Sequence, residues 1–139
     1  MALRLPKIRA VWPVRPRARY APRRDGRPDP GEVVWAWVPY EEDASQGKDR
    51  PVLVIDVEDD QVLALGLTSR DHDVDEAQER RDGREWMDIG TGDWDSRRRP
   101  SEVRLNRLLR LPVSGVRREG AALPKPVFDA VVAAAQPYL

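Results

Sequence analysis

Arg50 and Thr68 are the residues whose types and positions point most directly to chemistry. Arg50 precedes the apolar run from Pro51 to Val57, and Thr68 ends the run that begins at Gln61. A guanidinium stays protonated and binds two phosphate oxygens at once, and a threonine hydroxyl can donate to the same oxygens. The order strand, polar loop, arginine, strand, turn, strand, threonine brings both groups toward one end of a small sheet. This arrangement could bind or cleave a phosphodiester.

Each candidate also has an ordinary structural interpretation. Thr68 could be a strand-end threonine chosen for its β-propensity, and Arg50 could form a surface ion pair with Asp49 or Glu42. His72 has a reference pKa near neutrality and could act as a general base, although its charged surroundings favour a solvated side chain.

Trp94 and Arg97 are further accessory candidates, because they lie together in a later loop. Trp94 could stack on a nucleobase beside the basic run that contains Arg97. Packing over the mouth of a barrel is the alternative for Trp94.

Three short strands must position Arg50 and Thr68. Residues 33–38 are apolar on both faces, which predicts a strand in a small barrel or beneath other elements. Residues 52–57 and 61–68 predict a hairpin around an acidic turn, and Gly66 predicts a bend or bulge.

The second half of the chain predicts a charged excursion, short strands and one helix. The excursion covers residues 70–84 and contains few apolar residues. Prolines flank the final apolar segment, which shows helical spacing. The strands are expected at 85–89, 101–105 and 108–113, and the helix at 126–135. The fold class expected is mainly β, a small barrel with a C-terminal α-helix.

Composition restricts the classes of function. The chain has no cysteine, which excludes disulfides, thiol catalysis and thiolate metal sites. A single histidine argues against a zinc or iron site built by the protein. No apolar run is long enough for a membrane span, so we expect a soluble, cytoplasmic protein without a cofactor.

The net charge of zero conceals a strong asymmetry. Residues 1–30 carry nine Lys and Arg against two acids, a charge of +7, and residues 31–139 carry −7. Six prolines in the first 30 residues argue against a helix or a central strand there. We therefore expect a basic arm over 1–30, extended or disordered, with Trp12 and Tyr20 as anchors, and a domain over 31–139. The arm could contact nucleic acid or fold back on its own domain.

Several motifs in the domain carry a family resemblance. A G-[DE]-[IV]-[VW] strand opening matches residues 31–34, and a polar S-x-Q-G loop leading into an R-P-V strand corresponds to residues 45–54. A T-S strand end matches Thr68 and Ser69, and an S-x-[VA]-x-[LV] strand matches residues 101–105. In these motifs the chain resembles the PemK/MazF toxins of type II toxin-antitoxin systems.

The resemblance implies an SH3-like barrel, a homodimer and a cognate antitoxin. It also implies a metal-independent endoribonuclease that cuts single-stranded RNA, leaving a cyclic phosphate and a free hydroxyl. Arg50 and Thr68 take the positions of the family's catalytic arginine and threonine. The RNA-binding candidates, in the loop and beside these two positions, are Ser45, Gln46, Lys48 and Ser69.

A second function remains compatible with the same fold, because fold alone does not decide function. Relatives of this fold poison a topoisomerase, so a non-catalytic nucleic-acid- or protein-binding barrel is the alternative. In that case Arg50 and Thr68 would be dispensable.

Overall fold

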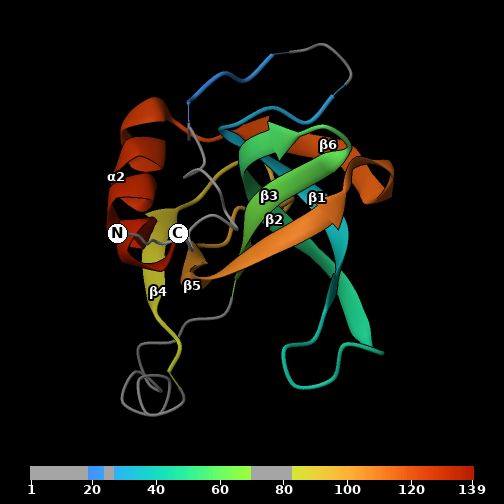
Figure 1. The fold of residues 1–139 in the computed structure, drawn as a ribbon. Coiled ribbons are helices and arrows are strands. Elements are labelled where there is room, and N and C mark those ends of the chain that lie inside the picture. Colours follow the sequence, from blue (N-terminus) through green and yellow to red (C-terminus); the bar gives the residue numbers. More distant parts are fainter. Residues whose placement is uncertain (1–18, 24–26, 70–82) are drawn as a thin grey trace, which may run out of the picture.

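The computed structural model describes residues 19–23, 27–69 and 83–139 (Figure 1). Two short 3-10 turns, Val113–Gly115 and Gln136–Tyr138, accompany the longer elements. Those elements are β1 (Glu32–Pro39), β2 (Gly47–Glu58), β3 (Gln61–Thr68), β4 (Trp86–Gly90), β5 (Ser101–Pro112), β6 (Val116–Ala122) and α2 (Lys125–Ala135).

The strands form one six-stranded antiparallel sheet in the order β4-β5-β3-β2-β1-β6. The mainly β class with a C-terminal helix is confirmed. The sheet is not a closed barrel, because β4 and β6 are its two edges in the described part of the chain. The hairpin of β1 and β2 extends beyond the body of the sheet and ends in the loop that precedes Gly47 (Figure 1).

Both faces of the sheet are apolar, as the pattern of β1 predicts. Val33 belongs to a cluster on one face, together with buried residues of α2, and Val34 belongs to a second cluster on the other face. The second cluster is formed by side chains of β1, β2, β3 and β5 alone, with partly buried valines around it. Curvature of the sheet brings these strands close enough to bury one another's side chains.

Helix α2 covers the first face. It begins at Lys125, with Pro126 in its first turn, where a missing backbone donor does no harm. Phe128, Val131 and Ala135 are buried against the sheet at the spacing of one helix face. The expected C-terminal helix is therefore present. No helix among the described residues is long and apolar enough to cross a membrane.

Tyr20 anchors the described part of the N-terminal segment to this layer. Its hydroxyl donates to the carbonyl oxygen of Leu123 at 2.6 Å, and its ring lies 5.4 Å from that of Phe128. Gly31 has φ +101° and lies against the Tyr20 ring, so a Cβ there would lie 2.5 Å from Cδ1. Trp12, the other expected anchor, lies outside the described residues.

Two expectations for the second half need correction. Residues 101–105 and 108–113 were expected as two strands, but Ser101–Pro112 is one strand. A register shift in its pairing with β3 falls at Gly66, which confirms the predicted bulge and lets β5 bend without breaking. Strand β6 has no counterpart among the expected elements, since Arg-Arg-Glu-Gly interrupts its apolar pattern.

Candidate functional site

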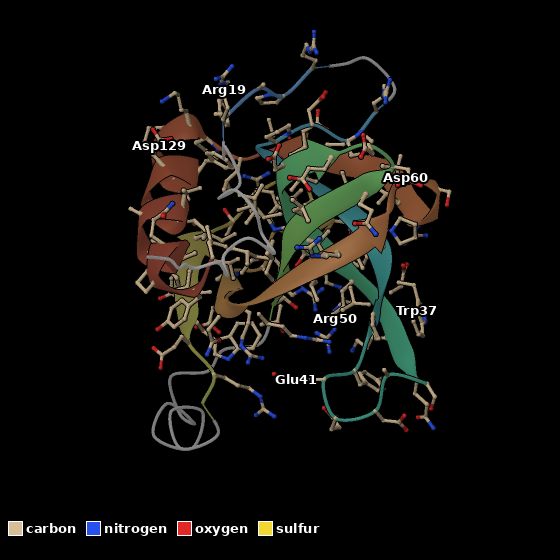
Figure 2. All side chains as sticks on the ribbon, viewed as in Figure 1. Arg19, Trp37, Glu41, Arg50, Asp60 and Asp129 are labelled. Atoms are coloured by element: carbon tan, nitrogen blue, oxygen red, sulfur yellow. The ribbon has the colours of Figure 1, made fainter. Side chains whose placement is uncertain are left out.

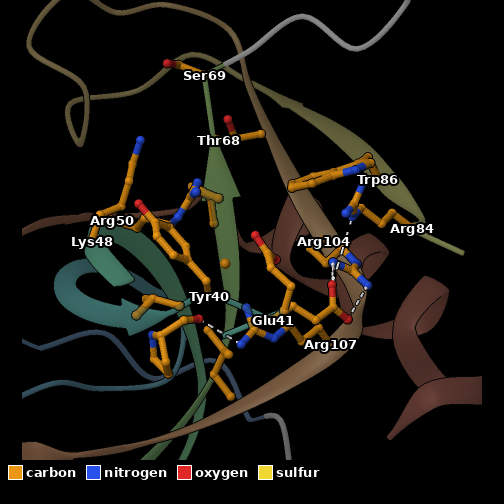
Figure 3. Close-up of a pocket in the computed structure, with 16 residues that line it drawn as sticks. Tyr40, Glu41, Lys48, Arg50, Thr68, Ser69, Arg84, Trp86, Arg104 and Arg107 are labelled. Atoms are coloured by element: carbon orange, nitrogen blue, oxygen red, sulfur yellow. Dashed lines mark hydrogen bonds and ion pairs between the residues drawn. The ribbon is translucent and has the colours of Figure 1, made fainter. Parts of the chain in front are cut away.

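Arg50 and Thr68 reach the same end of the sheet from adjacent strands. The β2–β3 pairing joins Val52 to Gly66, and each candidate lies two residues beyond that pair on its own strand. Side chains alternate along a strand, so an equal offset of two places both on one face. Both line a cavity of about 410 Å³ (Figure 3). The structure therefore brings the two together, as the sequence predicts.

The cavity is strongly cationic although the domain is acidic. Five basic side chains line it against the two carboxylates Glu41 and Glu42, and Thr68 and Ser69 add hydroxyls at its edge (Figure 3). The basic residues are Lys48, Arg50, Arg84, Arg104 and Arg107. Positive charge gathered in one hollow attracts phosphate, whatever the net charge of the rest.

Arg104 is the most buried cation of the cavity, with 8% of its surface exposed. Its Nη1 and Nη2 donate to Glu41 Oε1 and Oε2 at 3.1 and 3.2 Å, and its Nε donates to Asn106 Oδ1 at 2.6 Å. The hydrogen bonds and charge of Arg104 lower the pKa of Glu41, against the opposing effect of burial, with Arg107 and Arg84 adding to the lowering. Glu41 is therefore a carboxylate at neutral pH.

Arg107 and Arg84 flank this pair from different elements. Nη2 of Arg107 donates to the carbonyl oxygen of Pro39 at 2.8 Å, which fixes the end of β1. Desolvation lowers the pKa of Arg107, a shift that Glu41 opposes. Nε of Arg84 lies 3.9 Å from Glu41 Oε1. Asn106 accepts from the backbone N–H of Glu85 at 3.2 Å, so the segment that carries Arg84 is tied to β5.

A second cavity of about 330 Å³ adjoins the first at Arg50 and Thr68. Both residues line it, as do Lys48, Leu67 and Ser69, so these five residues form the boundary, or ridge, between the two cavities. Trp35, Pro51 and Trp94 give the second cavity apolar walls, and Asp49, Asp95 and Arg99 give it charge.

Trp94 is buried, with 3% of its surface exposed. Its indole N–H donates to Ser101 Oγ at 3.0 Å, and its carbonyl oxygen accepts from Trp35 Nε1 at 3.3 Å. A side chain held in this way packs in the core and cannot offer a full ring face to a base. The burial of Trp94 favours the packing alternative, and stacking on a base stays a prediction without structural support.

Arg97 is exposed and lines neither cavity. Its backbone N–H donates to Asp95 Oδ1 at 2.9 Å, and Arg99 donates from Nε to Oδ2 at 2.8 Å. Burial raises the pKa of Asp95, but these hydrogen bonds and the charge of Arg99 outweigh it, and the net direction is downward. In this basic run it is Arg99 that faces the second cavity.

Ser45 and Gln46 are exposed in the loop between β1 and β2 and line neither cavity. Ser45 donates from its N–H and its hydroxyl to Asp43 Oδ1, at 3.1 and 2.6 Å. Gln46 joins the loop ends, its carbonyl oxygen accepting from the Tyr40 N–H at 2.8 Å. The loop thus turns these two residues outward. His72 lies outside the described residues.

Five charged cavity residues were not among the predicted site residues: Glu41, Glu42, Arg84, Arg104 and Arg107. Arg104 lies between Val103 and Leu105 in an apolar strand, and an arginine there must find a partner or a ligand. That signal could have identified Arg104, but its partner lies 63 residues away in the sequence. Among the described residues no three His, Cys, Asp or Glu side chains gather in a way that could hold a metal ion.

Comparison with known families decides what kind of protein this is. Residues 29–139 match the family described as PemK-like, MazF-like toxin of type II toxin-antitoxin system. The chain belongs to this toxin family. The match covers the sheet, α2 and both cavities, and it confirms the resemblance seen in the motifs.

The toxin fold is also found among solved structures. The chain is similar to one in the crystal structure of MazE-MazF (Form-II) from Deinococcus radiodurans, with a TM-score of 0.56 and 19% identity. The alignment covers 81% of this toxin and 96% of that chain, and at this identity it shows the fold. No curated protein matches the toxin.

Proposed function

We propose that this toxin is an endoribonuclease that cuts single-stranded RNA without a metal ion, with Arg50 and Thr68 at the reacting phosphate. One observation carries the proposal. A guanidinium and a hydroxyl from adjacent strands line the same cationic cavity and stand on the ridge between two hollows. A ridge of this kind suits an extended RNA strand that crosses it and places one phosphate at Arg50.

The chemistry follows from what RNA cleavage requires. The ribose 2′-oxygen attacks phosphorus and the bond from phosphorus to the 5′-oxygen breaks, leaving a 2′,3′-cyclic phosphate and a 5′-hydroxyl. The 2′-hydroxyl loses one proton and the leaving oxygen gains one, so the proton count balances. Negative charge builds on the non-bridging oxygens, where Arg50 would grip two oxygens and Thr68 would donate a hydrogen bond.

Electrostatics support RNA as the substrate. RNA affinity comes largely from phosphate neutralisation, which an acidic domain would oppose. Within the cavity the charge balance is the reverse of that of the domain, because five of its lining residues are basic and two are acidic. Lys48 and Ser69, on the same ridge as Arg50, would contact the RNA backbone there.

We also propose a protein partner and a dimer. The structural neighbour is named as a MazE-MazF complex, which supports a cognate antitoxin for this toxin. An acidic antitoxin segment would suit the cationic cavity. A homodimer is expected from the family, and the mass of the purified chain in light scattering would test it.

The decisive experiment is cleavage of a mixed-sequence single-stranded RNA in the presence of a chelator, with end-mapping of the products. The unaltered protein should leave cyclic phosphate and 5′-hydroxyl ends. Arg50→Ala should lower kcat about 100- to 1,000-fold, the loss typical for removal of a group that stabilises transition-state charge.

Arg110→Ala is the matched control, since it removes the same charge from an exposed position on β5 that lines neither cavity. The proposal fails if Arg50→Ala cleaves as fast as Arg110→Ala. RNA binding without cleavage by the unaltered protein would instead support the non-catalytic barrel.

A further inference from the structure

The Glu41–Arg104 pair has the geometry of an arginine holding a phosphate. Both Glu41 oxygens accept from the two terminal nitrogens of Arg104 (Figure 3). The Arg104 Nε donates separately to Asn106. A bidentate fork of this kind is how a guanidinium binds carboxylate and phosphate alike. An anion therefore already occupies the face that Arg104 turns toward the cavity.

The two partners differ sharply in how they are held. Arg104 lies on β5, and 10% of its side chain is exposed, whereas 46% of the Glu41 side chain is exposed. Glu41 comes from the loop between β1 and β2, whose own hydrogen bonds, such as Asp43 with Ser45, do not include its carboxylate. The cation is thus fixed in the sheet, and the anion is presented by a loop at the surface.

We propose that Arg104, with Arg84 and Arg107 beside it, is a second phosphate subsite, and that the Glu41 carboxylate fills this subsite until RNA displaces it. The inference rests on the proposed function, because it assigns a second phosphate of the same RNA strand. The chemical class of the ligand is a phosphodiester monoanion, which carries the same charge as the carboxylate that it replaces.

Burial explains why an internal anion is needed. A guanidinium that is nearly removed from water is costly when it has no counter-charge. Without RNA, Glu41 supplies that charge, and the resulting pair is a modest one because its acid is well exposed. When an RNA strand is already bound at Arg50, one of its phosphates can replace the Glu41 carboxylate at Arg104. The buried Arg104 cation then has an anionic partner both before and after the exchange.

This arrangement predicts opposite effects on stability and on binding when Glu41 is changed. Glu41→Gln removes the counter-charge of Arg104, so the protein without RNA should unfold at a lower temperature. The same change removes a competitor of the RNA phosphate, so RNA should bind more tightly. A carboxylate that only oriented Arg104 would give the opposite result for binding.

The test uses an RNA with a 2′-deoxy nucleotide at the mapped cleavage position, which binds but cannot be cut, with fluorescence anisotropy as the readout. Glu41→Gln should lower Kd about tenfold relative to the unaltered protein, within the range of single charged contacts at interfaces. Glu42→Gln is the matched control, because it removes the same charge from the same loop and cavity. It should lower Kd by much less.

A double-mutant cycle with Arg104→Gln completes the test. In that background Glu41→Gln should improve binding no more than Glu42→Gln does. Equal Kd values for Glu41→Gln and Glu42→Gln with Arg104 present, or weaker binding by Glu41→Gln, would overturn the second subsite while cleavage by the unaltered protein upholds the proposed function. Absence of both RNA binding and cleavage in the unaltered protein would overturn the two together.

Discussion

At the scale of single residues, the candidate site combines charged side chains with an uncharged hydroxyl, that of Thr68. Thr68 is polar and 8% exposed, at the last position of β3, opposite Glu102 on β5. A hydroxyl in this position can donate into the cavity without the mobility of a long side chain. In the proposed mechanism Arg50 would act on the phosphate in both binding and reaction, whereas Thr68 would act mainly on the charge that develops in the transition state.

Replacing Thr68 by valine tests this division. Thr68→Val keeps the branched shape that suits a strand and removes only the hydroxyl. We expect kcat to fall about 100-fold while Kd for the 2′-deoxy RNA changes little, because a donor that acts mainly in the transition state affects rate rather than binding. Single-turnover cleavage and anisotropy measure the two effects.

Ser69→Ala is the comparison for that variant, since Ser69 follows Thr68 and lines both cavities. A similar loss of kcat in both variants, or a loss in Ser69→Ala alone, would contradict the special role of Thr68. Thr68→Val also removes the hydroxyl of a buried residue, which should cost about 1 to 3 kcal/mol of stability, and thermal unfolding would measure this cost.

At the scale of elements, the three strands between Glu32 and Thr68 could be predicted from local pattern, although β2 begins at Gly47 and was expected only from residue 52. The strand from Glu32 to Pro39 and the hairpin closed at residues 58–60 follow from β-branched and apolar runs that end at proline or at turn residues. The offset that unites Arg50 and Thr68 follows from the same hairpin register. Local rules sufficed because the interactions that decide these elements are close in sequence.

The remaining part of the site could not be predicted because it depends on contacts distant in sequence. Arg104 reaches Glu41 only after β5 has paired with β3, and Arg84 is fixed through Asn106. Strand β6 forms beside β1 although its own sequence is polar, because β1 offers an unpaired edge. The role of Trp94 could not be decided from the sequence for the same reason, because its contact with Trp35 also joins residues far apart in the chain.

Asp95 makes the fold of this loop testable. Its carboxylate holds the Arg97 N–H and the Arg99 side chain while the residue itself is buried. A carboxyl whose pKa is lowered by folding adds stability above its unfolded value of about 3.8, and that stability is lost as the pH falls through the lower folded value.

Asp95→Asn should therefore destabilise the protein at pH 7 by about 1 to 3 kcal/mol, because a charged acceptor is lost. The difference from the unaltered protein should shrink as the pH falls toward 3. Urea unfolding at several pH values measures it, and Asp88→Asn, on the exposed face of β4, is the control. A difference that did not depend on pH would contradict the role of the charge.

At the scale of the whole molecule, a basic N-terminal segment is joined to an acidic domain that contains a cationic cavity. Tyr20 ties this segment to Leu123 and Phe128, close to α2. Figure 2 shows Arg19 near the top of the view, above Arg50 and Glu41, which lie in its lower half. Residues 1–18, which precede this anchored segment in the sequence, carry five Lys and Arg. From their charge we expect them to attract RNA at long range and to take no part in the cleavage step.

Removing residues 1–18 should therefore change binding but not cleavage. Each phosphate neutralised on a single strand contributes about 0.7 to the slope of log K against log salt, so loss of five basic residues should reduce the slope by up to about 3.5. The Kd for RNA should rise at low salt and approach that of the full chain at high salt. The mapped cleavage position and kcat should not change.

A full-length control with glutamine at those five positions should behave like the truncation, since charge rather than length is responsible. An unchanged salt slope in both proteins would show that the arm does not contact RNA, and a lower kcat in the truncation alone would place part of residues 1–18 at the reaction itself.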